Sequence, residues 1–487
     1  MKREPLIHAG AVFHFFGMLI IIEAFFMLFA VAVALAVDDQ SVKPLVLSFL
    51  VTLVTGFFVR NATVKYHYDS LRRRESILVV VGTWLIISLM GVLPYILSGS
   101  IKNFTDAFFE TVSGFTTTGS SILTDIEAVP KGILFWRSLT HWIGGMGIIV
   151  LLVALSPFLK VSSIYLFNNE ASVVISDKVN PRMFEDARMI WVIYVVLTVL
   201  EVILLHLGGM DFFDSTCHAF GTVATGGFST RNASVGAFSP YIQYVITVFM
   251  FLSGANFFLY LLIINRRIKV ALKNEELRLY AKIIFLAGAA LTLILYFKQN
   301  MDFESAFRDA YFQVVSIITA TGFATDDYLQ WPVYGWLIIL GLMFIGASAG
   351  STGGGIKVIR HLIFFKYLKI QYRKLLHPNL VATVHYNGRY IDDETLTKVT
   401  NYIILYVLVF VAASLTLSFM KIDPETSFGS VITCMGGIGP GFGLTGPASN
   451  FEMLPPAAKD VLILMMLMGR LELYTFLVIF TPSFWKL

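Results

Sequence analysis

Long apolar segments alternate with short polar loops along the whole chain. A helix needs about 20 apolar residues to cross a bilayer, with a lower limit of roughly 17, and ten segments are long enough. They are residues 11–36, 44–60, 77–98, 133–157, 189–208, 240–264, 280–297, 333–365, 399–419 and 459–482. The pattern therefore predicts ten membrane-spanning helices.

Four shorter helical stretches lie between these spans, and each leads into a turn rich in Thr and Gly. They are predicted near residues 103–115, 212–223, 305–318 and 426–435. At about 1.5 Å rise per residue, each covers roughly half of a bilayer, so we expect them to be re-entrant. Irregular backbone at membrane depth is tolerated only where protein buries it or it lines a wet cavity.

One pattern recurs in all four stretches: a polar residue precedes a glycine by thirteen positions. The pairs are Asp106 and Gly119, Asp214 and Gly227, Asp309 and Gly322, and, with Thr in place of Asp, Thr426 and Gly439. Four such units can surround one axis and line it with backbone carbonyls, as in potassium-selective filters. We therefore expect an all-α integral membrane protein. Its four tandem helix–pore loop–helix units surround a pseudo-fourfold pore, as in potassium channels, and two extra transmembrane helices precede them.

This reading divides the chain into five parts. Residues 1–75 form two introductory helices and a basic loop, and the pore units cover residues 76–187, 188–277, 278–395 and 396–487. All four units run in the same direction. A solute symporter with broken helices would instead be expected to show inverted pairs of repeats.

Composition and charge placement agree with a membrane protein. The chain is 56% hydrophobic and only 14% charged, whereas about 25% of residues are charged in soluble proteins. Lys and Arg gather in the loops after the second, sixth and eighth spans, and the opposite loops carry mainly Asp and Glu. The positive-inside rule then places the basic loops and both termini in the cytoplasm, with the re-entrant segments entering from outside.

Few residues offer chemistry other than transport. Cys217 and Cys434 provide neither a disulfide framework nor a metal site, and we interpret them as packing residues. No paired nucleophile and base is apparent. The sequence therefore predicts neither an enzyme nor a cofactor, and no nucleotide-binding segment.

The four turns are the candidate cation ligands. A dehydrated monovalent cation needs several oxygen ligands at once, and small residues let the backbone present its carbonyls. A run of Thr and Gly can also be an ordinary helix C-cap, but four runs in register favour a filter. The expected ligands are the backbone carbonyls of Thr117, Thr118, Gly119, Thr225, Gly226, Gly227, Ala320, Thr321, Gly322, Gly437, Ile438 and Gly439.

The chain resembles the TrkH/KtrB superfamily of potassium transporters over its whole length, and within it the TrkH branch, which has the two-helix start. The resemblance rests on the four turns and on three further motifs. These are Trp142-Ile143-Gly144-Gly145-Met146-Gly147, Gly350-Ser351-Thr352-Gly353-Gly354-Gly355-Ile356-Lys357 and Gly469-Arg470-Leu471-Glu472.

The resemblance implies potassium flux through one pore per protomer in the bacterial inner membrane. It also implies a homodimer and control by a cytosolic nucleotide-binding partner of the TrkA type. Serine at the first central glycine accompanies sodium transport in plant relatives, and Gly119 here argues against that. Gly437 departs from the family pattern, which often has Asn at this position.

A glycine-rich segment interrupts the eighth span. Residues 346–355 contain five glycines, and each costs roughly 1 kcal/mol in a helix relative to Ala. Unwound backbone at this depth should line the pathway, so we expect a flexible gate. A phosphate-binding loop or a helix-packing seam is the alternative, although the spacing to Lys357 does not match a Walker motif. The gate candidates are Gly350, Ser351, Thr352, Gly353, Gly354, Gly355 and Lys357.

Arg470 lies near the middle of the last predicted span. A charge there costs about 2.5–3.5 kcal/mol on insertion scales and therefore faces protein or water. We expect Arg470 to project below the filter as a positive barrier. The alternative is a buried ion pair, although Glu472, two residues away, lies on a different helix face.

Other polar residues have more modest expected roles. Asp106, Asp214 and Asp309 are expected to cap the re-entrant helices, and Asn256 and Glu23 to form interhelical hydrogen bonds. His141 is either a titrating group or a ring at a membrane interface. Residues 366–398 form a basic stretch that suits either a protein partner or anionic lipid headgroups. A sodium-selective or poorly selective cation transporter of the same architecture remains an alternative, as does coupling to sodium or protons.

Overall fold

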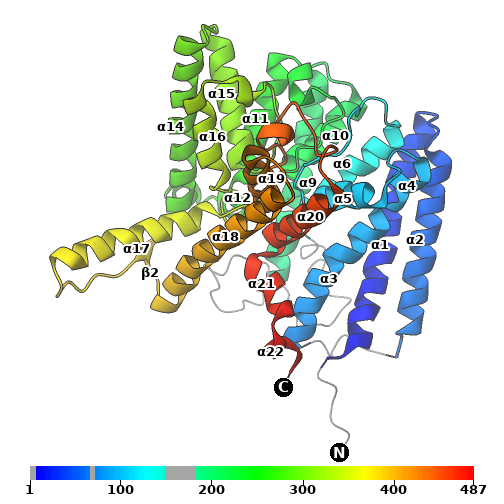
Figure 1. Cartoon of the computed structure of the whole chain (residues 1–487), viewed down its shortest axis with the longest axis horizontal. Coiled ribbons are helices and arrows are strands. Elements are labelled where there is room, and N and C mark those ends of the chain that lie inside the picture. Colours follow the sequence, from blue (N-terminus) through cyan, green and yellow to red (C-terminus); the bar gives the residue numbers. More distant parts are fainter. Residues whose placement is uncertain (1–6, 66–71, 146, 148–182, 487) are drawn as a thin grey trace, which may run out of the picture.

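The computed structural model describes residues 7–65, 72–145, 147 and 183–486, and the described parts are almost entirely helical (Figure 1). The introductory helices α1 (Ala9–Ala36) and α2 (Val42–Ala62) lie side by side at one edge of the molecule. They pack closely because Gly17 of α1 contacts the backbone of Arg60, and Gly56 of α2 contacts Ile21. Small residues at such contacts let membrane helices approach each other.

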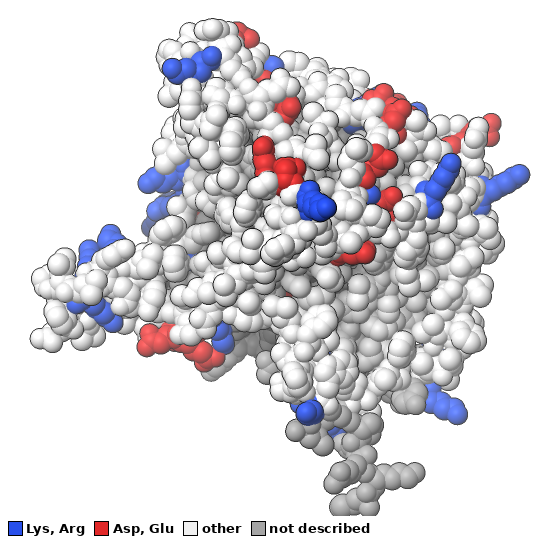
Figure 2. All heavy atoms as spheres, in the orientation of Figure 1, with Lys and Arg blue, Asp and Glu red and all other residues white. Residues whose placement is uncertain are grey.

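Six helical segments in the described residues are each long and apolar enough to cross a membrane. They are α1, α2, the segment Arg74–Ser98 that includes α3 (Arg73–Gly91) and α4 (Leu93–Ser98), α9 (Met183–Leu207), α14 (Glu275–Lys298) and α18 (Asp393–Phe419). A wide surface without charges covers α1–α3, whereas Asp and Glu gather in the upper part of the same face (Figure 2).

Two predicted spans are sharply bent, and up to eight spans result if each bent pair is counted as one. Residues 240–264 form α11 (Pro240–Gly254) and α12 (Phe257–Ile264), which meet at 92°. The last span bends by 119° where α20 (Pro456–Leu471) meets the segment Leu473–Phe480. A helix cap at Asn256 and a left-handed residue at Glu472 account for the two breaks.

The remaining two predicted spans also differ from continuous helices. Residues 333–365 consist of α16 (Val333–Met343), a non-helical segment 344–357, and the start of α17 (Val358–Leu376). The glycines in that segment explain why the helix does not continue. In the fourth predicted span, α6 covers Lys131–Gly145, and the predicted residues 148–157 lie outside the described residues.

The four predicted half-length helices are confirmed as helices of 12 to 16 residues. They are α5 (Phe104–Phe115), α10 (Phe212–Val223), α15 (Phe303–Ile318) and α19 (Pro424–Gly436). Their caps differ from the prediction: the residues whose side chains accept the first free N–H groups are Asn103, Asp211, Asp302 and Asp423.

Asp106 and Asp214 therefore do not cap these helices. Asp106 bonds Lys459 at 2.6 Å, and Asp214 bonds Arg231 at 2.7 Å. Asp309 lies seven residues beyond Asp302, the cap of α15. All three lie further along their helices than the caps, so their carboxylates are free to bond residues outside the first turn.

The basic stretch 366–398 contains more structure than expected. α17 projects sideways from the helical body (Figure 1). After it, β1 (His385–Tyr386) and β2 (Arg389–Tyr390) pair antiparallel, with His385 opposite Tyr390. Asn387 and Gly388 form the two-residue turn with positive φ angles of 49° and 78°, as hairpin turns of this length require.

Candidate functional site

Each re-entrant helix ends in a turn of the same backbone conformation. Two positions in every turn have positive φ: the central glycine and the residue two positions before it. The φ values are 55° and 81° at Thr117 and Gly119, 54° and 78° at Thr225 and Gly227, 58° and 82° at Ala320 and Gly322, and 66° and 99° at Gly437 and Gly439. Gly437, which departs from the family pattern, thus adopts the same conformation as its counterparts.

The hydrogen bonds of the four turns also repeat. In each, the N–H just before the central glycine donates to the carbonyl five residues earlier. The bonds run from Thr118 to Ser113 at 2.9 Å, Gly226 to Gly221 at 2.7 Å, Thr321 to Ser316 at 2.9 Å, and Ile438 to Thr433 at 2.9 Å. With their N–H groups occupied in this way, the four peptides have a common orientation relative to their helices.

The four turns form a closed ring, because each central glycine lies against a carbonyl oxygen of the next turn. A Cβ atom on Gly119 would lie 2.1 Å from the oxygen of Gly226. The corresponding distances are 2.0 Å from Gly227 to Thr321, 1.7 Å from Gly322 to Ile438, and 3.0 Å from Gly439 to Thr118. The ring therefore brings together all four predicted turns. A side chain cannot be added at its central glycines without displacing the backbone of the neighbouring turn.

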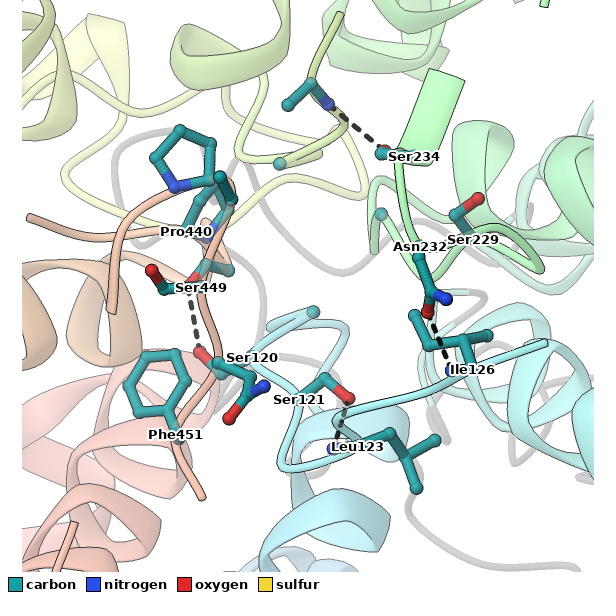
Figure 3. A pocket seen from close by; sticks show the side chains of 18 of the residues that line it. Ser120, Ser121, Leu123, Ile126, Ser229, Asn232, Ser234, Pro440, Ser449 and Phe451 are labelled. Atoms are coloured by element: carbon teal, nitrogen blue, oxygen red, sulfur yellow. Dashed lines mark hydrogen bonds between the residues drawn. The ribbon is translucent and has the colours of Figure 1, made fainter. Parts of the chain in front are cut away.

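A cavity of about 170 Å³ lies on one side of the ring and is lined by all four central glycines. In Figure 3, Ser120 and Phe451 face this space together with Ser229 and Asn232 from the second unit. Asn232 also accepts a hydrogen bond from the N–H of Ile126 at 2.7 Å. Hydroxyl, amide and backbone groups thus supply much of the wall.

Asp125 lies next to this wall. It accepts a hydrogen bond from Asn232 at 2.9 Å, and this bond lowers the pKa of the Asp125 carboxyl. The group therefore stays ionised at neutral pH, which places a negative charge beside the cavity.

Polar side chains nine residues before the central glycines hold the segments that follow three of the turns. Glu110 accepts from the N–H of Ile122 at 2.8 Å. His218 bonds the hydroxyl of Ser229 at 3.0 Å. Ser430 bonds the hydroxyl of Thr445 at 3.2 Å. Each re-entrant helix in these three units therefore fixes the path of the chain on both sides of its turn.

A buried ion pair within the first unit also contacts the second unit. Arg137 of α6 bonds Glu110 of α5 at 2.7 Å, and their side chains are 2% and 0% exposed. Arg137 also donates to the carbonyl of Ser229 at 3.0 Å and lies 3.5 Å from the ring centroid of Phe228. The sequence interpretation did not include this pair, although charges inside predicted membrane segments are themselves a signal of function.

His141 lies behind the ring and is fully buried, so its predicted place at a membrane interface is wrong. Its Nδ1 bonds the carbonyl of Gly114 at 2.7 Å, and its ring stacks on Phe228 with 3.9 Å between centroids. The imidazole of His141 also packs against Gly226. His141 therefore separates the first two turns and sets their spacing.

On the other side of the ring, the non-helical segment 344–357 lies against the ends of three re-entrant helices. A Cβ on Gly353 would lie 2.6 Å from the oxygen of Thr319, and one on Gly354 would lie 2.2 Å from that of Gly436. Thr352 donates to the carbonyl of Val223 at 3.2 Å. The glycines are needed here because backbone packs directly on backbone.

The other predicted gate residues hold this segment in shape. The carbonyl of Gly350 accepts from the N–H of Phe257 at 3.0 Å, and the hydroxyl of Ser351 donates to Ser348 at 2.7 Å. Gly355 has a φ of 71°. Lys357 donates to the carbonyl of Gly353, so its amine bonds the loop itself.

Arg470 connects this segment to the first unit. Its guanidinium donates to the carbonyl of Thr352 at 2.8 Å, to the carbonyl of Gly144 at 2.6 Å, and to the hydroxyl of Thr117 at 3.3 Å. Glu472 instead bonds Arg360 at 2.7 Å. Arg470 therefore lies directly below the ring, with backbone oxygens as its principal partners.

The remaining polar residues follow the predictions less closely. Asn256 caps α12 by accepting from the N–H of Phe258, so its bond is local and not interhelical. Both carboxylate oxygens of Glu23 are buried and accept no hydrogen bond within the described part of the chain. The described residues also contain no cluster of three His, Cys, Asp or Glu side chains that could hold a metal ion.

The buried ion pair leads to a stability prediction. Glu110→Gln or Arg137→Met alone should destabilise the protein by about 3–5 kcal/mol, because each leaves a buried charge without its partner. The double variant should recover much of this loss. Thermal unfolding in detergent measures all three, with Lys398→Met, at an exposed ion pair, as the control. A double variant no better than the worse single variant would contradict this account.

Comparisons with known proteins agree with this architecture. The family model described as "Cation transport protein", TrkH, matches residues 40–487. The Trk system potassium uptake protein TrkH of Escherichia coli (strain K12) is 39% identical over 98% of this chain and 100% of its own length. The corresponding protein TrkG of the same strain is 34% identical over 98% of this chain and 99% of its own.

A solved structure covers the same length. The crystal structure of the potassium transporter TrkH from Vibrio parahaemolyticus superposes with a TM-score of 0.88, at 34% identity, over 99% of this chain and 100% of that one. Both the sequence and the fold of the whole chain therefore match. The chain belongs to the TrkH family of cation transport proteins, and it is a multi-span membrane transport protein and not an enzyme.

Proposed function

We propose that this protein takes up potassium across the bacterial inner membrane through the ring of four turns. The observation that carries the proposal is the closure of the ring, in which the carbonyls of Thr118, Gly226, Thr321 and Ile438 each meet the central glycine of a neighbouring turn. The relatives named above are potassium uptake proteins, which supports potassium as the ion.

The ring offers the chemistry that a dehydrated potassium ion needs. Carbonyl oxygens from twelve residues in four equivalent turns replace its water ligands. Each re-entrant helix ends at its turn, so the negative ends of four helix dipoles point toward the ion. The protein contributes no cofactor in this proposal, and potassium is the substrate.

The cavity above the ring serves as the entrance. Two arginines line it, and each is bonded to a carboxylate: Arg137 to Glu110 and Arg231 to Asp214. Their positive charges are therefore offset locally. Serine, asparagine and backbone groups can then replace some of the water molecules that an arriving cation carries as ligands.

The segment 346–355 and Arg470 form the gate. The segment lies below the ring against the ends of α10, α15 and α19, and Arg470 binds it to the first unit. A positive guanidinium and a loop across the pathway both oppose the passage of a cation. The amine of Lys357 bonds the carbonyl of Gly353 and so helps to hold the loop in place. We propose that the structure represents the closed state.

The wider assembly is part of the proposal. We infer a homodimer, a cytosolic nucleotide-binding partner of the TrkA type, and cytoplasmic termini. The division into an introductory pair, residues 1–75, and four pore units follows from the four equivalent turns. Basic residues of the stretch 366–398 provide a surface for the partner or for anionic lipid headgroups.

Gly119→Ser should reduce the preference for potassium over sodium about tenfold or more, because its Cβ would lie 2.1 Å from the oxygen of Gly226. This preference is measured from rubidium uptake into cells that lack other potassium uptake systems, with potassium and sodium as competitors. Gly99→Ser is the matched control, since Gly99 has a φ of 72° but no atom within 4 Å of its Cβ position. Equal competition by sodium in the unmodified protein would contradict the potassium assignment.

Arg470→Ala should raise rubidium uptake about tenfold, because it removes a positive charge from the pathway and a charged hydrogen bond to Thr352. Arg60→Ala, at an exposed position on α2 outside the pore units, is the control and should leave the rate unchanged. Initial rates in the same cells, normalised to the amount of protein in the membrane, compare the variants. Unchanged or lower uptake in Arg470→Ala would contradict the barrier role.

A further inference from the structure

Two consecutive glutamates at the start of α14 hold two different parts of the protein. Glu276 is fully buried, whereas Glu275 is about one-third exposed. The side chain of Asn274 caps the helix by accepting from the N–H of Leu277 at 3.0 Å. The cap fixes where the helix begins, and with it the directions in which the two glutamates point.

Glu276 binds both ends of the segment below the ring. Its Oε1 accepts from the N–H of Ala349 at 2.7 Å and from the N–H of Ile359 at 3.2 Å. Ala349 precedes the glycine-rich motif, and Ile359 lies in the first turn of α17. One buried side-chain oxygen thus joins the two ends of the loop through two hydrogen bonds.

Glu275 binds the hairpin that follows α17. Its N–H donates to the side chain of Asn387 at 2.9 Å, and its Oε1 accepts from the N–H of Asn387 at 3.1 Å. Its other oxygen forms an ion pair with Lys366 of α17, which also donates to the carbonyl of His385 at 2.7 Å. The tip of the hairpin is therefore held by the residue next to Glu276.

We infer that Glu276 is a latch that keeps the intramembrane loop closed, and that the hairpin tip at Asn387 sets the position of this latch through Glu275. The inference rests on the proposed role of the loop as a gate. Glu275 and Glu276 belong to the same helical turn, so a displacement of the hairpin shifts both. Any partner that binds the hairpin better in its displaced position will then favour the open loop.

The latch predicts the behaviour of two substitutions at one position. Glu276→Ala should raise rubidium influx into proteoliposomes without a partner protein by about tenfold, because both hydrogen bonds that join the ends of the loop are lost. Glu276→Gln keeps one acceptor oxygen and should raise influx much less. Glu394→Ala removes an exposed glutamate of α18 and is the matched control, with influx equal to that of the unmodified protein.

The hairpin is tested separately, at an exposed position where folding is not at risk. Asn387→Gly, which tolerates the positive φ of 49° at this position and removes the side chain that accepts from the N–H of Glu275, should raise influx. It should also speed hydrogen–deuterium exchange of the backbone amides in residues 346–359, because the latch is loosened from a distance. Exchange in α5 and α10 should not change. A merely structural role of the hairpin would speed exchange near residues 384–391 alone, and that result would overturn the connection between hairpin and loop.

A variant with residues 351–354 deleted distinguishes failure of the latch from failure of the gate. If the deletion raises influx but Glu276→Ala does not, the latch is wrong and the gate stands. If neither raises influx, the gate is wrong and the latch fails with it. Equal rises in Glu276→Ala and Glu276→Gln would show that charge matters and the hydrogen bonds do not, which also overturns the latch.

Discussion

The central glycine of each turn presses against a carbonyl oxygen of the neighbouring turn, and the rest of the architecture is arranged around these four contacts. Three of the four leave less than 2.2 Å between a hypothetical Cβ and the oxygen, so only glycine closes the ring. The contacts require four helices that stop at the same depth, and α5, α10, α15 and α19 do so because each ends in the same left-handed turn. The cavity above and the loop below both take their shape from this ring.

The ring is regular, but different kinds of side chain support it in different units. Between the first and second units, Arg137, paired with Glu110 of its own unit, donates to the carbonyl of Ser229 at 3.0 Å. Between the fourth and first units, the hydroxyl of Ser120 donates to the carbonyl of Gly439 at 3.0 Å. Tyr328 of the third unit donates to Gly441 of the fourth at 2.5 Å. Backbone geometry common to all four units is therefore maintained by residues that have diverged, as expected when the repeats belong to a single chain.

The contrast between a backbone geometry common to the four units and side chains that differ among them explains what could be predicted from the sequence. Spacing and local pattern predicted the half-length helices closely, because their ends are set by glycines within the same stretch of chain. Hydropathy could not reveal the bends at Asn256 and Glu472, since an apolar run of sufficient length looks the same whether straight or bent. The wrong caps, Asp106 and Asp214, have the right chemistry for an N-terminus but lie three residues beyond the true caps, Asn103 and Asp211. Long-range partners such as Arg137 and Glu110, 27 residues apart, emerge only from the packing of α5 on α6.

The arrangement below the ring has a further consequence for regulation. The loop is held by hydrogen bonds within it, such as that from the N–H of Gly346 to the carbonyl of Ile356 at 2.9 Å, and by bonds to Arg470, to the re-entrant helices and to Glu276. Its bonds to Arg470 and Glu276 are made by side chains outside the ring, whereas the four turns are held to one another by their own backbone contacts. Selection of the ion and control of its passage can therefore be carried by separate parts of the structure.

The most direct test of the central claim is anomalous scattering from crystals of the protein grown with thallium(I) in place of potassium. The account predicts an anomalous peak on the axis of the ring, within coordination distance of the carbonyl oxygens of Thr118, Gly226, Thr321 and Ile438. Competition with potassium, but not with sodium, should reduce the peak. A ring without a peak at saturating thallium, with the ion bound elsewhere along the axis, would contradict the proposal that these carbonyls select the ion.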